Sequence, residues 1–108
     1  MKNPKFAAAF EKYFAGCEAA YMNYHNACGF SPELVNKFEY KAGRKYVKVI
    51  QVLSGGEQRS VHSFVNMENG EVLKPAGWAK PAKHARGNIF DENNGLGSMG
   101  PHGPASLR

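Results

Sequence analysis

Cysteine is scarce in this sequence, and its two cysteines stand where they cannot pair. Cys17 and Cys28 fall on one predicted helix, eleven positions apart. A rise of about 1.5 Å per residue separates them by roughly 16 Å, which is too far for a disulfide. The chain also has no Cys-x-x-Cys pair of the kind that binds zinc. We therefore predict two free thiols in a reducing compartment, each packed as a small buried apolar side chain.

Long apolar runs are missing as well. No stretch has the length and uniform hydrophobicity of a membrane span. The N-terminal segment does not have the pattern of a signal peptide, because Glu11 and Lys12 interrupt the residues that follow Lys2 and Lys5. We expect a cytoplasmic protein without a membrane partner.

Patterns typical of catalysis or of cofactor binding are absent too. Ser54-Gly55-Gly56 lacks the lysine and the hydroxyl residue of a phosphate-binding loop. The four histidines show no i, i+4 pair of the kind that binds a metal from one helix. No nucleophile, base and orienting acid stand in a recognisable pattern. We predict no enzymatic activity, no cofactor and no metal site. A hydrolase is the remaining alternative, and it requires a histidine beside a carboxylate, from the candidates His62, His84, Glu57, Glu71 and Asp91.

The composition is that of one small basic domain. A chain of 108 residues suits a single hydrophobic core, and 43% apolar residues are enough to form one without a metal or a disulfide. Lysine and arginine number 14 and the acids 9, so the formal net charge is +5. This surplus favours an anionic partner, either nucleic acid or an acidic protein surface.

The N-terminal third has the periodicity of an amphipathic helix. Asn3 can cap it, Pro4 suits the first helical position, and Gly29 can end it, so we predict a helix over residues 4–28. The residues of one helix face recur at three- and four-residue spacing: Phe6, Phe10, Phe14, Cys17, Tyr21, Tyr24 and Cys28. We expect this face to cover a sheet, with an exposed stripe that docks a partner as the alternative.

The middle of the chain has a β pattern. Tyr46–Leu53 is β-branched and apolar on both faces, as a central strand should be. Ser60–Val65 and Glu71–Lys74 follow as strands, and Asn69-Gly70 between them makes a hairpin turn. Another turn is expected at Ser54–Glu57. Because the connections are short, neighbouring strands should pair antiparallel in a meander.

Together these elements predict an α+β fold. An N-terminal amphipathic helix packs on a three- to four-stranded antiparallel meander over about residues 38–78, in a single domain that spans residues 1–90. A short second helix can open at Ser31-Pro32-Glu33, before the sheet. Regular structure should fade after Trp78, and residues 91–108 form an irregular arm rich in glycine and proline.

The most distinctive stretch of the sequence is the basic segment Lys74–Asn88. Acids are absent from Val72 through Phe90, and the only tryptophan of the chain sits among the cations. Cations that hold phosphates beside an aromatic ring that stacks on a base are typical of a groove for single-stranded nucleic acid. The alternative is a solvated loop in which the tryptophan is a core anchor. The candidate binding residues are Lys74, Trp78, Lys80, Lys83, His84 and Arg86, and Arg44 and Arg59 can extend them.

Several short segments between Tyr46 and Asn88 also occur together in a known group of proteins. In order they are Ser60–Val65, Asn69–Val72, Lys74–Trp78, Lys80–Lys83 and Ala85–Asn88. This cassette resembles one in small uncharacterised proteins encoded by tailed bacteriophages, and the N-terminal helix is mostly outside the resemblance. The resemblance implies a phage origin and the cytoplasm of the bacterial host. It implies no activity and no functional residues.

Three non-enzymatic functions follow from these observations. The leading hypothesis is a bacteriophage accessory protein that binds nucleic acid through the tryptophan-containing segment 74–88. The second hypothesis is a protein-binding module that modulates a host or phage protein. Residues 88–108 would order on the partner, and the basic segment would match an acidic surface on it. The third is a small structural component of the virion, with the arm threading between subunits. The sequence does not indicate an oligomeric state.

Overall fold

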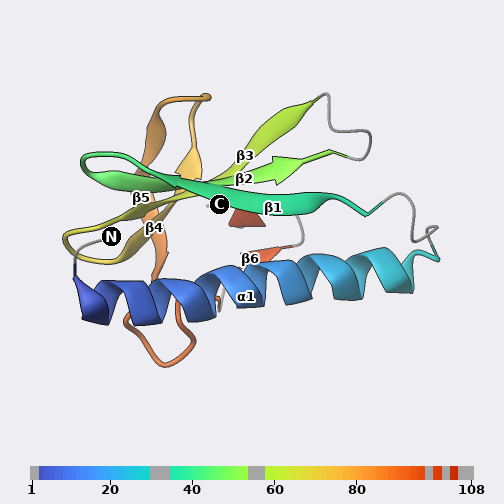
Figure 1. Ribbon diagram of the computed structural model, residues 1–108, viewed down its shortest axis with the longest axis horizontal. Helices are drawn as coiled ribbons and strands as arrows, with labels where there is room; N and C mark the ends of the chain where they lie inside the picture. The colour runs from blue at the N-terminus through green and yellow to red at the C-terminus, as the bar shows by residue number, and fades with distance from the viewer. Residues whose placement is uncertain (1–2, 30–34, 54–57, 97–98, 101–102, 105–108) are drawn as a thin grey trace.

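The computed structural model describes residues 3–29, 35–53, 58–96, 99–100 and 103–104, and it places one helix against an antiparallel sheet (Figure 1). The elements, in chain order, are α1 (Pro4–Ala27), β1 (Lys37–Ala42), β2 (Tyr46–Val52), β3 (Arg59–Asn66), β4 (Glu71–Pro75), β5 (Pro81–Asn88), β6 (Met99–Gly100) and β7 (Gly103–Pro104). Strands β1 to β5 form the main sheet, and β6 and β7 pair with each other. The predicted α+β fold is confirmed. The predicted short helix at Ser31 and the turn at 54–57 lie outside the described residues.

Helix α1 begins and ends close to where its caps predict. The Asn3 side chain accepts hydrogen bonds from the backbone N–H groups of Lys5 and Phe6, at 2.9 and 3.3 Å. The last residue of α1 is Ala27. Gly29 follows the helix with a φ of 71°, a conformation that suits glycine. The helix continues through Gly16, where a Cβ atom would collide with the side chain of Leu96. Glycine at this position therefore lets the segment after β5 pack closely on the helix.

One face of α1 packs on the sheet and supplies four of the nine buried side chains of the core cluster. Figure 1 shows the helix lying along the sheet, with the segment after β5 (orange) looping past its other side. The core is one cluster of buried side chains: Phe6, Phe10, Tyr13, Cys17, Val47, Val49, Val65, Val72 and Ile89. The alternative of an exposed docking stripe is therefore wrong for Phe6 and Phe10. The burial expected for Cys28 is also wrong, because the buried stripe continues through Tyr21 to His25 and leaves the C-cap residue exposed.

The main sheet is a meander of five strands, whereas the sequence predicts three or four. Strand order follows chain order from β1 to β5, and all four pairings are antiparallel. The predicted hairpin turn at Asn69-Gly70 joins β3 to β4, with a Gly70 φ of 77°. Strand β5 occupies residues where regular structure was expected to fade. Its residues are poor strand formers, but β4 offers an edge whose backbone groups need partners, and backbone pairing depends little on side-chain type.

The two thiols should differ sharply in reactivity. Burial raises the pKa of the Cys17 thiol from its ordinary 9.0 to about 12, whereas Cys28 is exposed. Because the thiolate is the reactive form, a water-soluble disulfide reagent should modify one thiol in the native protein and two in denaturant. The measurement is the stoichiometry of released chromophore at mildly alkaline pH. A Cys28→Ser variant should show no fast-reacting thiol, and fast modification of that variant would contradict the buried position of Cys17.

Candidate nucleic-acid interface

The sheet has a second face, turned away from α1, and a row of side chains crosses it. Lys41 on β1 pairs with Lys48 on β2, Lys48 pairs with Phe64 on β3, and Phe64 pairs with Leu73 on β4. Cross-strand partners project to the same face, and their neighbours along the strands project to the other. The neighbours here include the core residues Val47, Val49, Val65 and Val72. The row from Lys41 to Leu73 therefore lies on the face opposite the helix, which we call the outer face.

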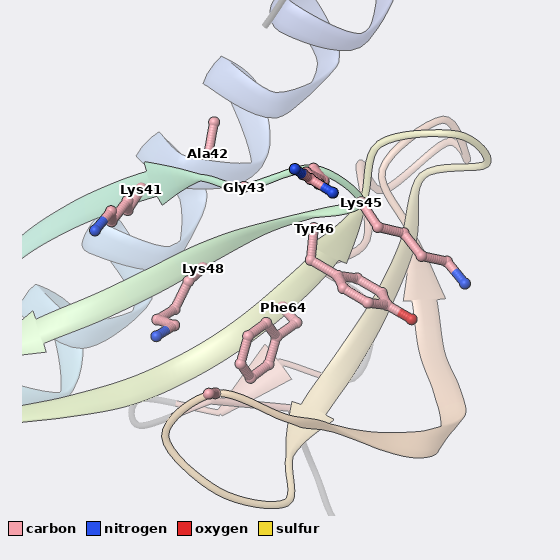
Figure 2. Close-up of a pocket in the computed structure, with 9 residues that line it drawn as sticks. Lys41, Ala42, Gly43, Lys45, Tyr46, Lys48 and Phe64 are labelled. Atoms are coloured by element: carbon pink, nitrogen blue, oxygen red, sulfur yellow. The ribbon is translucent and has the colours of Figure 1, made fainter.

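A basic cavity of about 260 Å³ lies on the outer face, beside the turn between β1 and β2 (Figure 2). Four of its nine lining residues are cations and none is an acid. Figure 2 shows the side chains of Tyr46, Lys48 and Phe64 projecting from the same side of the sheet. The lining residues are Lys41, Ala42, Gly43, Arg44, Lys45, Tyr46, Lys48, Phe64 and Ala79. Ala79 belongs to the loop between β4 and β5, so the cavity joins this loop to the β1–β2 hairpin.

Cations and aromatic rings are interleaved around this cavity. The Nζ atom of Lys48 lies 4.3 Å from the centroid of the Trp78 ring and 6.0 Å from that of Phe64. The Nζ atom of Lys45 lies 5.5 Å from the ring of Tyr46. The rings of Tyr46 and Phe64 meet edge to face, with centroids 6.0 Å apart and an interplanar angle of 75°.

Trp78 is on the surface, so the alternative that it anchors the core is wrong. Its side chain is 52% exposed. The physical reason is that the loop after β4 turns to the outer face, and the helix that closes the core lies on the other one. The tryptophan is held over Lys48 at the sheet surface, next to the basic cavity.

Two more of the predicted binding residues reach the same face. Lys80 and Lys83 are exposed and line a second cavity, of about 540 Å³, which shares Lys45 and Tyr46 with the first. The second cavity is less basic, because two acids, Glu68 and Glu71, also line it. The stronger positive charge therefore lies at the β1–β2 end of the outer face.

The remaining predicted residues are not brought into this arrangement. Neither cavity is lined by Lys74 or Arg86, which are both half-buried. Val72 pairs with Gly87 and Leu73 with Ala85, so Arg86 is the extra residue of a β-bulge, and its Nε and Nη1 atoms are buried. The side chain of His84 lies outside the described part of the structure. The segment 74–88 is thus a hairpin whose bulges divide its cations, not one continuous basic loop.

Other cations were missed because the sequence spreads them over two strands and a turn. Lys41 and Lys45 lie in or beside the connection between β1 and β2, and Lys48 alternates with valines in β2, a pattern that by itself indicates a solvated face. The sequence feature that could have revealed them is the presence of four cations, these three and Arg44, within residues 41–48, because a hairpin brings such residues together. Arg44, proposed as an extension, does line the cavity. Arg59 does not, because it pairs with Glu39 at 3.2 Å.

His62, one of the histidines considered for a hydrolase, is buried in the core. Val49 pairs with Ser63 and Ile50 with Val61, so His62 is the extra residue of a second bulge. Its Nδ1 atom lies 2.9 Å from the hydroxyl of Ser63, which is itself 2.6 Å from the hydroxyl of Tyr13. His62 is therefore a core histidine held by a hydrogen bond, and it has no access to a substrate at the surface.

Two of the carboxylates that a hydrolase would require beside a histidine accept hydrogen bonds from residues close to them in the chain instead. Glu71 accepts a hydrogen bond from the Asn69 side chain at 2.6 Å. Asp91 accepts from the backbone N–H groups of Asn93 and Gly95, both at 3.0 Å. Glu57 lies outside the described residues. Within the described part of the chain, no three His, Cys, Asp or Glu residues gather as metal ligands do.

Residues 6–99 match the family of unknown function DUF7717, and the chain belongs to that family. No curated protein and no solved structure matches the chain. Among the described residues there is no helix of the length and apolar character that a membrane crossing requires. The resemblance to bacteriophage proteins stays a prediction.

Proposed function

We propose that this protein binds nucleic acid, without catalysis, through the outer face of its sheet. The observation that supports this most strongly is the lining of the basic cavity, in which four cations and two aromatic rings gather without an acid. The site is centred on the β1–β2 hairpin and takes in Trp78, Lys80 and Lys83 from the β4–β5 hairpin. It therefore includes half of the residues that the sequence indicates and adds the hairpin cations.

The pairing of Lys41 with Lys48 is the second argument for an anion. Like charges directly opposite each other on neighbouring strands destabilise a sheet. None of the four cavity cations makes an ion pair with an acid in the described part of the chain. A phosphate between the two lysines would convert this repulsion into two attractive contacts, which gives the pair a role that the fold alone does not supply.

The dimensions of the site favour a polymer that passes over the surface. A volume of about 260 Å³ is just below the range of about 300–1,000 Å³ that encloses most small ligands. It accommodates a phosphate and part of a nucleotide. The second cavity continues from the first through Lys45 and Tyr46, so a chain of nucleotides can follow the outer face from one to the other.

The proposed setting is the cytoplasm of a bacterial host, in which the protein acts as a phage accessory factor. The resemblance to tailed-bacteriophage proteins supports this setting. The two free cysteines are consistent with a reducing compartment.

The test is a salt titration with labelled single-stranded DNA, single-stranded RNA and duplex DNA. For three or four phosphate contacts to a single strand, the slope of log K against log salt should be about −2 to −3. Affinity should then fall by about 30-fold between about 50 and 200 mM salt. A nuclease-treated pull-down from bacterial lysate is run in parallel. A stoichiometric protein partner, together with no nucleic-acid binding at the lowest salt, would overturn the proposal in favour of a protein-binding module.

A further inference from the structure

The contact between Lys48 and Trp78 joins the two hairpins of the outer face. The ammonium group stands over the indole ring at 4.3 Å, and the ring is otherwise half open to solvent. Trp78 lies in the loop after β4, whereas Lys48 is on β2 beside Lys41. One lysine thus covers an aromatic face and also belongs to the cation pair that faces the basic cavity.

These two roles of Lys48 compete for a single ammonium group. A cation over an exposed aromatic ring is held weakly, because water solvates the ammonium almost as well. A charge-assisted hydrogen bond to a phosphate is stronger, and Lys41 directly opposite adds a second positive charge to hold the same phosphate. A phosphate at the cavity would therefore draw the ammonium away from the ring and uncover the indole.

We infer that the outer face selects single-stranded nucleic acid, with one phosphate between Lys41 and Lys48 and a neighbouring base stacked on Trp78 in place of the ammonium. This inference rests on the proposed function and adds to it the class of nucleic acid and the mode of binding. An unpaired base has a free ring face to offer, and stacking on an aromatic side chain tolerates any base. Bases inside a duplex are already stacked on their neighbours, so a duplex can satisfy the lysines but not the tryptophan.

Trp78 supplies its own reporter, because it is the only tryptophan of the chain. The experiment follows its fluorescence while the protein is titrated with four probes: an oligothymidylate, an abasic oligonucleotide of equal length, a duplex of equal length, and inorganic phosphate. The abasic strand has the phosphates without the bases. We expect strong quenching by the oligothymidylate, and weak quenching by the other three.

Affinity measurements with variants separate stacking from charge. Trp78→Ala should weaken oligothymidylate binding by about tenfold and leave abasic binding within about twofold, as expected for the loss of one stacked base. Trp78→Phe should restore most of the difference, because phenylalanine keeps a ring. Phe90→Ala is the matched control: Phe90 is also half exposed, at 48%, but it packs against Phe6 at the start of α1 and should not affect either probe.

The outcomes distinguish this inference from the proposed function. If Trp78→Ala weakens both strands equally, or if the duplex binds as tightly as the oligothymidylate without changing the fluorescence, nucleic-acid binding stands and the stacking mode is wrong. If none of the nucleic acids binds at low salt, the proposed function itself is wrong, and the inference falls with it.

Discussion

Replacing Lys41 and Lys48 together with alanine should weaken the binding of a labelled single strand by about 100-fold at low salt. Each lysine is expected to donate a hydrogen bond to phosphate, and a hydrogen bond to a charged group contributes about 1.5 kcal/mol or more. The salt dependence should change as well, because two lost phosphate contacts reduce the slope of log K against log salt by about 1.4 for a single strand. Fluorescence anisotropy over a range of salt concentrations measures both quantities.

A matched control removes two positive charges from a surface that lies away from the cavity. Lys5 and Lys12 are exposed on α1, on the other side of the molecule from the outer face. Lys5→Ala with Lys12→Ala lowers the net charge by the same amount and should weaken binding by no more than about threefold, through the long-range field alone. Equal losses in the two double variants would mean that net charge, and not the cavity, attracts the nucleic acid.

The double variant that replaces Lys41 and Lys48 with alanine should fold at least as well as the parent protein. The side chain of Lys41 is exposed, and its removal relieves the repulsion with Lys48 across the strands. The loss of the contact between Lys48 and Trp78 offsets part of this gain. A midpoint of thermal unfolding that is unchanged or slightly raised would show that the pair serves binding. A marked fall would indicate that the lysines support the fold.

Phe10→Ala should destabilise the protein by about 3–5 kcal/mol, the usual cost of deleting a large buried aromatic side chain. The side chain of Phe10 is only 1% exposed. Its ring contacts aromatic side chains of both layers, with centroid distances between 5.1 and 6.1 Å, namely those of Phe6, Tyr13, Phe14 and Tyr40. Alanine at this position would leave a cavity where α1 meets β1, which neither element can close without losing its other contacts. Urea unfolding followed by circular dichroism measures the change.

Trp78→Ala is the comparison for that measurement. A tryptophan in the core would cost about 3 kcal/mol or more when removed. Because Trp78 is half exposed and contacts Lys48 at the surface, its loss should cost less than about 1 kcal/mol, the range of an exposed cation–π contact. A destabilisation equal to that of Phe10→Ala would place the tryptophan inside the fold and remove it from the proposed site.

Local signals predicted most of the fold correctly. The bounds of α1 follow from Asn3, Pro4 and Gly29, whose effects act within a few residues. Strands β2 to β4 follow from β-branched composition, and the turn between β3 and β4 follows from Asn69-Gly70. Strand β5 was missed because its residues are poor strand formers and pair only because β4 presents a free edge.

Only part of the site was predicted, because the rest depends, like strand β5, on pairing between strands. Trp78, Lys80 and Lys83 stand out in the sequence because they form a basic stretch without acids. The contribution of Lys41 and Lys48 depends on strand register, which places one opposite the other and brings Trp78 over the second. Register is a pairing between distant segments, and composition does not reveal it.

Sequence alone was therefore sufficient for the basic charge, the amphipathic helix, the meander and the presence of a cationic segment with one tryptophan. These properties depend on residue type and on contacts between near neighbours in the chain. The exposure of Trp78, the exclusion of Lys74 and Arg86 from the cavities, and the assembly of the β1–β2 cations into one of them depend on long-range packing. The helix covers one face of the sheet, and the bulges in β3 and β5 redirect side chains between the two faces. Only the folded chain therefore shows which charges gather on the outer face.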